Sequence, residues 1–379
     1  FGSSHISQGQ VQGLVEVGRL PFLAMQATCG MVESLKGSSA SLLDRDGELS
    51  EEMEDALDAQ CSSNELLEAW ALREDSVLQA KAKCIDSLPL SKDIRGMALR
   101  FLGNLVQMVG LPLKCWFEAS TLIDAYCLRS LRTPDACTPC KIPSLCVATV
   151  RVLKKMDSAG HWGTQGVDSG HAQYLSQCLE SLACGPMKEI CEEDIQDMES
   201  SFLSTLQWQV NLPSLESWVS VFCTRLNIFT HGALLQSLAW VWEQTVFHAQ
   251  AMVLSRSPNA ELPPRLIAAG LLGLNLVRAN LLPFEALHHT TTESAPAPNS
   301  VIANHLLESL QMAVRCSPES LSEACRCTGT ALMEAMDSCP EGIAAAQGRD
   351  LPGMSAAKPA SADSSHGHAQ GNSKHFSSV

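Results

Sequence analysis

The chain has 379 residues, of which 45% are hydrophobic and only 5% aromatic, and its formal net charge is -15. This length allows two domains of ordinary size plus tails, and the scarcity of aromatic residues favours helices over β-sandwiches or barrels. The negative charge argues against a nucleic-acid partner, which needs a basic face, and against an anionic membrane surface as partner.

The chain has sixteen cysteines, a number that also occurs in disulfide-rich secreted proteins. Most of them lie inside apolar helical patterns, as Cys115, Cys146 and Cys223 do. A buried free thiol behaves as a small hydrophobic group, so the pattern predicts unpaired thiols and a reducing compartment. Cys137 and Cys140 lack a second cysteine pair at zinc-finger spacing, and we therefore expect neither a metal site nor a cofactor.

Residues 1–50 are rich in Gly, Ser and Gln, which predicts a mostly disordered N-terminal region. Residues 51–90 follow as an acidic helical extension, and their alternating charges predict one or two solvated helices outside the main core. Compact structure is expected to begin near Ser91-Lys92-Asp93, where the side chain of Ser91 or of Asp93 can cap a helix.

A first unit of helices is predicted over residues 91–212. Gly- and Pro-containing breaks divide it, and between these breaks apolar residues recur at three- and four-residue steps. The five helical segments are predicted at 92–109, 113–129, 142–157, 170–184 and 192–207.

A second unit is predicted over 213–316, followed by an extra helix at 317–339 and a disordered tail at 340–379. Its most apolar run, Leu266 to Leu282, contains an Asn and an Arg, which favours a buried helix over a membrane span. Neither unit alternates as strands do, so the predicted fold class is all-α, with two tandem five-helix bundles. The helical segments of the second unit are predicted at 214–227, 231–254, 262–279, 282–289 and 299–316.

The stretch from Glu193 to Pro213 has the pattern of an amphipathic helix that ends in a Trp-x-Val-x-x-Pro exit. Glu199 and Leu203 project from a face next to the apolar stripe. The stripe itself consists of Ile195, Met198, Phe202 and Leu206.

This stretch resembles the last helix of a cyclin box, and Met198-Glu199 matches the Met-Glu near the start of that helix in the family. Arg95, followed by Phe101-Leu102, is similar to the Arg that opens the first helix of the family. Asp124-Ala125-Tyr126 resembles the Asp-Arg-Phe of its second helix, and in the family this Asp pairs with that Arg. Because an unpaired buried charge costs several kcal/mol, roughly, we expect Arg95 and Asp124 to form a structural ion pair.

Two further segments are similar to the family. The end of the third segment resembles its Ala-x-Lys-x-Glu, with Lys155 as the counterpart of the lysine and Lys154 as the alternative register. Pro264-x-x-Ile267-Ala268 is similar to the central helix of a second cyclin box. The resemblance covers roughly residues 75–316.

A cyclin is not an enzyme but a regulatory subunit, which binds and activates a cyclin-dependent protein kinase by ordering the C-helix of the kinase. The resemblance implies this role here, in the nucleus and/or cytoplasm, and the acidic net charge predicts no nucleic-acid or membrane partner. It implies that Lys155 and Glu199 bond to the kinase. The apolar contacts expected beside them are Val152, Met156, Leu203 and Trp208. A possible substrate-docking patch matches Ile94, Met97 and Phe101, although Ala98 and Asn104 depart from the residues of the family there.

Other functions are compatible with the sequence. A cyclin-fold protein can also serve in transcription, or as a helical scaffold without a kinase partner. An enzyme would need a nucleophile such as Cys178 or Cys184 near His161, Asp168 and His171. The sequence does not favour an enzyme, because a nucleophile needs a positioned base and such residues in a Gly-rich loop are usually incidental.

Overall fold

The computed structural model describes residues 51–82, 90–130, 138–156, 167–183, 189–255, 262–287 and 300–338. These residues form twelve α-helices, two short 3-10 helices and no strand, which confirms the all-α prediction. The two regions expected to be disordered, 1–50 and 340–379, lie outside the described residues.

The first group consists of five helices, four of which pack around the fifth. Helix α7 contacts the other four members, and every residue from Ile142 to Val150 within it is buried. The group begins where Ser91 caps a helix by accepting a hydrogen bond from the Ile94 amide at 3.3 Å. Its helices are α5 (Lys92–Met108), α6 (Leu113–Arg129), α7 (Ile142–Met156), α8 (Ser169–Ala183) and α9 (Glu192–Thr205).

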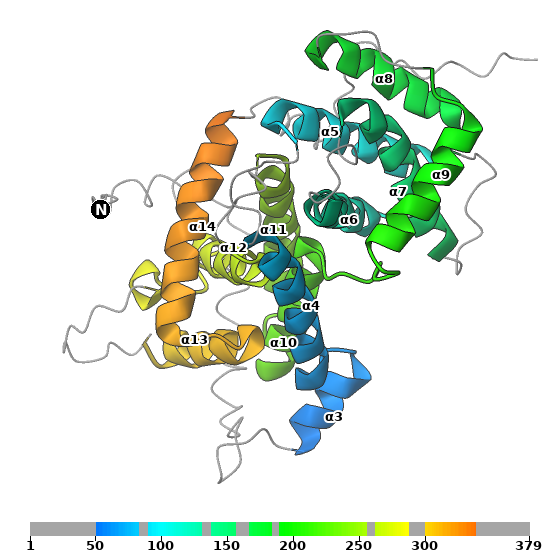
Figure 1. Ribbon diagram of the computed structural model, residues 1–379. Helices are drawn as coiled ribbons and strands as arrows, with labels where there is room; N and C mark the ends of the chain where they lie inside the picture. The colour runs from blue at the N-terminus through cyan, green and yellow to red at the C-terminus, as the bar shows by residue number, and fades with distance from the viewer. Residues whose placement is uncertain are drawn as a thin grey trace, which may run out of the picture.

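A second group packs around α12, which contacts α10, α11 and α14 (Figure 1). One predicted helix of this region is absent: the structure has only a single 3-10 turn, Phe284–Leu287, where a helix was expected at 282–289. A segment this short after Pro283 cannot build a ladder of α-helical hydrogen bonds. The helices of the group are α10 (Leu215–Phe229), α11 (Leu235–Ser255), α12 (Pro264–Arg278), α13 (Ser300–Val314) and α14 (Pro318–Ser338).

Helix α14, expected as an extra helix, packs closely along α12. Two glycines of α12 allow this approach. A Cβ atom at Gly270 would lie 2.6 Å from the Ala324 carbonyl oxygen, and one at Gly273 would lie 2.8 Å from the Cys325 Sγ. Helix α14 is therefore an integral part of the second group.

The N-terminal helices α3 (Glu51–Ala59) and α4 (Asn64–Ala82) correct one prediction. They were expected outside the main core, but Leu57 and Leu67 are buried in it. Trp70 of α4 meets Trp218 of α10 edge to face, with ring centroids 5.3 Å apart. Most of the charged side chains that alternate along this sequence lie on the outward face of these helices. The apolar face packs against α6 and α10.

The buried Arg225 of α10 fixes the turn between α3 and α4. The Arg225 residue is only 1% exposed. Its guanidinium donates to the Ser62 carbonyl at 2.6 Å and to the Asn64 Oδ1 at 3.0 Å. It also donates to the carbonyls of Met312 and Ala313, at 3.2 and 3.0 Å, at the end of α13. All four acceptors are uncharged, and burial lowers the pKa of Arg225 to about 10.

Arg265, in the first turn of α12, fixes α4 further along its length. Its guanidinium lies 3.0 Å from the Glu74 Oε2 and 2.7 Å from the Asp75 Oδ1. The Arg265 amide also donates to the Glu74 Oε1 at 3.0 Å. The N-terminal helices are thus tied to the second group at two separate places.

None of the helices within the described ranges combines the length and the apolar character that crossing a lipid bilayer requires.

Candidate functional site

The last turn of α7 and the middle of α9 bring Lys155 and Glu199 together. The Lys155 ammonium forms an ion pair with the Glu199 carboxylate. The lysine side chain is 68% exposed and the glutamate side chain 15% exposed, so the pair lies at an accessible rim of the molecule. A lysine in the last turn of a helix also interacts favourably with the helix dipole.

The structure distinguishes the two candidate lysines. Lys155 is exposed and contacts Glu199, whereas its neighbour Lys154 is half-buried on a different side of α7. Lys155 is therefore the lysine that shares the rim with Glu199.

Sequence reasoning missed a second ion pair on the same rim. Arg151 lies one helical turn before Lys155, and its guanidinium is 2.9 Å from the Glu192 Oε2. Its Nε donates to the Val167 carbonyl at 2.7 Å. This guanidinium lowers the pKa of the Glu192 carboxyl. Arg151 lies four residues before Lys155 on α7, and Glu192 lies seven residues before Glu199 on α9, so each shares a helix face with a member of the first pair. This spacing could have revealed the second pair from the sequence.

The four apolar candidates differ in accessibility. Met156 and Trp208 are exposed, Leu203 is half-buried and packs against the core, and Val152 is buried in the core. Met156 and Trp208 therefore offer a partner the most surface, and Val152 acts as a core side chain in this conformation.

Trp208 is held outward by an unusual backbone. Gln207 and Trp208 have φ angles of 53° and 61°, a left-handed conformation that costs a non-glycine residue about 1 kcal/mol or more. The Trp208 amide donates to the Leu203 carbonyl at 2.9 Å, which closes α9. Arg129 of α6 donates to the Leu206 carbonyl at 2.7 Å and so fixes the exit of the helix. The indole is 73% exposed as a result.

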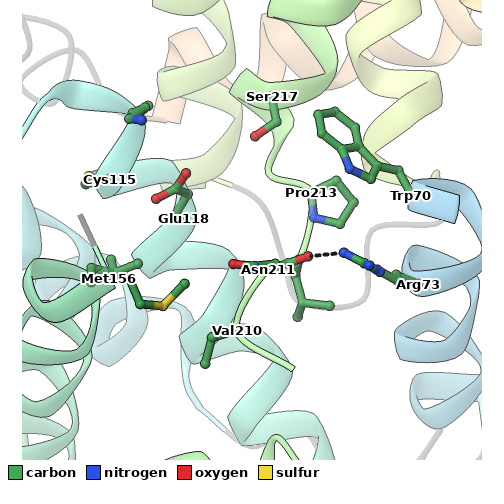
Figure 2. Close-up of a pocket in the computed structure, with 12 residues that line it drawn as sticks. Trp70, Arg73, Cys115, Glu118, Met156, Val210, Asn211, Pro213 and Ser217 are labelled. Carbon is green, nitrogen blue, oxygen red and sulfur yellow. Dashed lines mark hydrogen bonds between the residues drawn. The ribbon is translucent and has the colours of Figure 1, made fainter. Parts of the chain in front are cut away.

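A groove with a volume of about 370 Å³ begins beside Met156 (Figure 2). The end of α7, the start of α6, helix α4 and the segment that joins α9 to α10 form its walls. Arg73 crosses one side and donates to the Asn211 carbonyl at 3.2 Å, the contact drawn as a dashed line in Figure 2. The groove is lined by Trp70, Arg73, Lys114, Cys115, Glu118, Leu153, Met156, Val210, Asn211, Leu212, Pro213 and Ser217.

Arg95 and Asp124 form a bidentate ion pair between α5 and α6, with nitrogen–oxygen distances of 2.9 and 2.6 Å. The Arg95 side chain is only 3% exposed. Its third nitrogen donates to the Val253 carbonyl at the end of α11, at 2.7 Å. The pair therefore joins the two helical groups in addition to the first two helices.

The three residues of the possible docking patch lie on α5. Ile94 and Met97 are half-buried, and Phe101 is buried. Tyr174 of α8 stacks on the Phe101 ring, with centroids 6.4 Å apart, and covers part of the patch. Tyr174 therefore lies against the part of the patch that Phe101 would offer.

The structure describes only some of the residues that an enzyme would use. Asp168 and His171 contact each other at the start of α8, with the Nδ1 and Oδ1 atoms 2.7 Å apart. His161 and Cys184 lie outside the described residues. No group of three metal-ligating side chains comes together within the part of the chain that the structure covers.

A buried polar contact joins α11 and α12. The Nε2 of His248 lies 3.2 Å from a guanidinium nitrogen of Arg278, and the Arg278 guanidinium lies over the Trp240 ring. Burial, followed by the neighbouring Arg278 cation, lowers the pKa of His248 to about 4. The imidazole is therefore neutral at neutral pH, and protonation would place a second cation beside Arg278.

No protein-family model matches the chain, and no curated protein matches it at a significant level. The assignment to the cyclin family is therefore a proposal, and it rests on individual residues.

Proposed function

We propose that this chain is a cyclin-like regulatory subunit that binds a cyclin-dependent protein kinase and activates it by ordering the C-helix of the kinase. The observation that carries the proposal is the accessible ion pair of Lys155 and Glu199, formed by two helices and flanked by the exposed Met156 and Trp208. The resemblance assigns the same two charged residues to kinase contact.

The ion pair keeps hydrogen-bonding capacity for a partner. An ammonium group has three donors, of which Glu199 uses one, and a carboxylate has about four acceptor positions. Lys155 can thus donate to backbone carbonyl groups of a partner, while Glu199 accepts from its free backbone amides or side-chain donors. Charge-assisted bonds of this kind contribute roughly 1.5–3 kcal/mol each, and the exposure of Lys155 favours the lower end.

The apolar surface beside the pair supplies the larger part of the expected affinity. Met156 and Trp208 are large side chains that a docked helix would cover, and buried aromatic residues are frequent energetic centres of interfaces. The groove that begins at Met156 extends this surface toward α4. A kinase helix held here would keep its glutamate close to the ATP-binding lysine, one requirement of an active kinase.

The arrangement of the helices supports the same proposal. Helices α5, α6, α8 and α9 pack around α7, and α10, α11 and α14 pack around α12, so the chain has two successive helical groups as a two-box cyclin would, although α14 lies beyond the predicted second box. The ion pair of Arg95 and Asp124 also matches the pair that the family uses between its first two helices.

The test is affinity capture from native extract, read by mass spectrometry for a kinase catalytic chain, followed by affinity measurement with the purified kinase. Lys155→Ala and Glu199→Ala should each weaken binding by about tenfold or more, with unchanged circular dichroism. Lys92→Ala, which removes an exposed lysine at the start of α5, is the matched control and should bind like the wild type.

A charge-swapped variant separates binding from folding. Lys155→Glu combined with Glu199→Lys keeps an ion pair within the chain but presents the opposite charges to a partner. We expect this variant to fold normally and to lose binding. If it binds the kinase like the wild type, or if no kinase catalytic chain is captured by the wild type, the proposed function is wrong.

A further inference from the structure

Two Ser/Thr-Pro dipeptides lie within the described residues, and their surroundings differ. They are Thr138-Pro139, before α7, and Ser317-Pro318, before α14. Such dipeptides are acceptor sequences for proline-directed protein kinases. Proline fixes its own φ angle and has no amide hydrogen, so an enzyme can recognise it directly after the acceptor residue.

The hydroxyl of Ser317 is committed to the structure. It accepts a hydrogen bond from the Ser320 amide at 3.2 Å and contacts the Ser320 Oγ at 3.1 Å, so it caps the 21-residue helix α14. A kinase would have to break this cap to reach the hydroxyl. The third residue after the acceptor is Ser320, which offers no charge.

The hydroxyl of Thr138 is not committed in this way. It makes no capping hydrogen bond to the backbone, and it lies 3.0 Å from the Cys140 Sγ. The backbone at Thr138 is extended, with φ −70° and ψ 147°. Only the single 3-10 turn Pro139–Lys141 follows before α7 begins, and the hydrogen-bond geometry of such a turn is poorer than that of an α-helix. Lys141, three residues after the acceptor, is exposed.

We propose that Thr138 is a phosphorylation site for a proline-directed protein kinase. The Thr138 Oγ1 attacks the γ-phosphorus of ATP, and the bond between that phosphorus and the bridging oxygen to the β-phosphate breaks. The hydroxyl proton passes to the catalytic-loop aspartate of the kinase, and ADP leaves. The inference is independent of the proposed function, because it concerns an acceptor site and not the binding rim.

Phosphorylation would act on the central helix of the first group. The phosphate would carry about two negative charges at the start of the helical run from Pro139 to Met156, close to the exposed Lys141. Negative charge at the start of a helix is stabilising, so the phosphorylated chain should melt about 1–3 °C above the unmodified chain. The other end of the same helix carries Lys155.

The test uses the full chain, magnesium ATP and a purified, active proline-directed kinase bound to its own regulatory subunit. Thr133 and Ser257, which also precede prolines and lie outside the described residues, are replaced by Ala in all samples. Mass spectrometry should locate one phosphate on Thr138, with Ser317 modified at least about tenfold more slowly because its hydroxyl caps a helix.

Three variants provide the controls. Thr138→Ala and Pro139→Ala should each abolish the modification at position 138, and Lys141→Gln should slow it severalfold. Circular dichroism and melting of the unmodified variants show whether each one is folded. An unmodified Thr138 in the folded wild type, equal rates at Thr138 and Ser317, or normal modification of Pro139→Ala would each overturn the proposal.

Discussion

Replacement of Asp124 by Asn should destabilise the protein strongly. The change keeps the shape of the side chain but removes its charge, and one acceptor oxygen becomes a donor that faces the Arg95 guanidinium. Arg95 is 3% exposed, so it would lose its charged partner and one of its two hydrogen bonds to residue 124 at a place that water barely reaches, while its 2.7 Å hydrogen bond to the Val253 carbonyl remains.

The magnitude follows from this geometry. Breaking a fully buried ion pair costs about 3–5 kcal/mol. The Asp124 side chain is 30% exposed, and water can compensate part of the loss. We therefore expect Asp124→Asn to lower the free energy of unfolding by about 2–3 kcal/mol.

Urea unfolding followed by circular dichroism measures this loss. The double variant Arg95→Leu/Asp124→Leu is the informative control, because it removes the charge and its partner together. A double-mutant cycle of Arg95→Leu, Asp124→Leu and the double variant should give a coupling energy of about 2 kcal/mol. A coupling below about 0.5 kcal/mol would refute the view that the pair joins the helices energetically.

Four other changes have distinct expected outcomes. Gly270→Ala should lower the free energy of unfolding by about 1–3 kcal/mol, because its Cβ would lie 2.6 Å from the Ala324 carbonyl oxygen. Gly96→Ala, where a Cβ meets nothing within 4 Å, should instead raise it by about 0.5–1 kcal/mol; urea unfolding measures both, and equal effects would contradict the close packing. The folded pKa of His248 is about 4, below its usual 6.5, so the unfolded state binds the proton between these values and stability falls with falling pH. His248→Gln should remove about 2 kcal/mol of the stability difference between about pH 7 and pH 5, and an unchanged difference would show that other groups cause it. Trp208→Gly relieves a φ angle of 61° and should leave the free energy of unfolding within about 1 kcal/mol of the wild type, while kinase binding weakens; a loss of stability without a change in affinity would make Trp208 a structural residue.

Residues that helical periodicity places on defined faces could be predicted from the sequence. Glu199 flanks a regular apolar stripe, and Lys155 follows a run of buried positions, so each has a definable direction on its helix. The structure brings both to one rim. Arg95 and Asp124, similarly, belong to helices whose bounds were predicted to within one residue of the observed α5 and α6.

The groove could not be predicted in this way, because its walls come from four parts of the chain. The contribution of α4 was missed since its charges dominate the pattern, although Leu67, Trp70 and Val77 recur at three- and seven-residue steps. The left-handed backbone at Trp208 also gives no signal, because neither Gln207 nor Trp208 is a residue type that favours this conformation.

The second group shows a different limitation. The segment at 282–289 has enough apolar residues for a helix but too few positions to stabilise one. The packing of α14 against α12 depends on Gly270 and Gly273, which leave room for a neighbouring helix. Glycines in a sequence do not indicate which helix will pack there. Which helix fills such a gap is decided by tertiary packing.

The position of Arg225 has a consequence for synthesis and dissection of the protein. Its acceptors come from the turn after α3 and from the end of α13, segments that the ribosome makes at very different times. The growing polypeptide cannot surround this cation until most of its length has emerged, so the last folding step should join early and late segments. A shortened version that begins at Ser91 would lose the two acceptors of the Arg225 guanidinium that lie before Ser91, which are Ser62 and Asn64. We expect this version to be recovered only as aggregate.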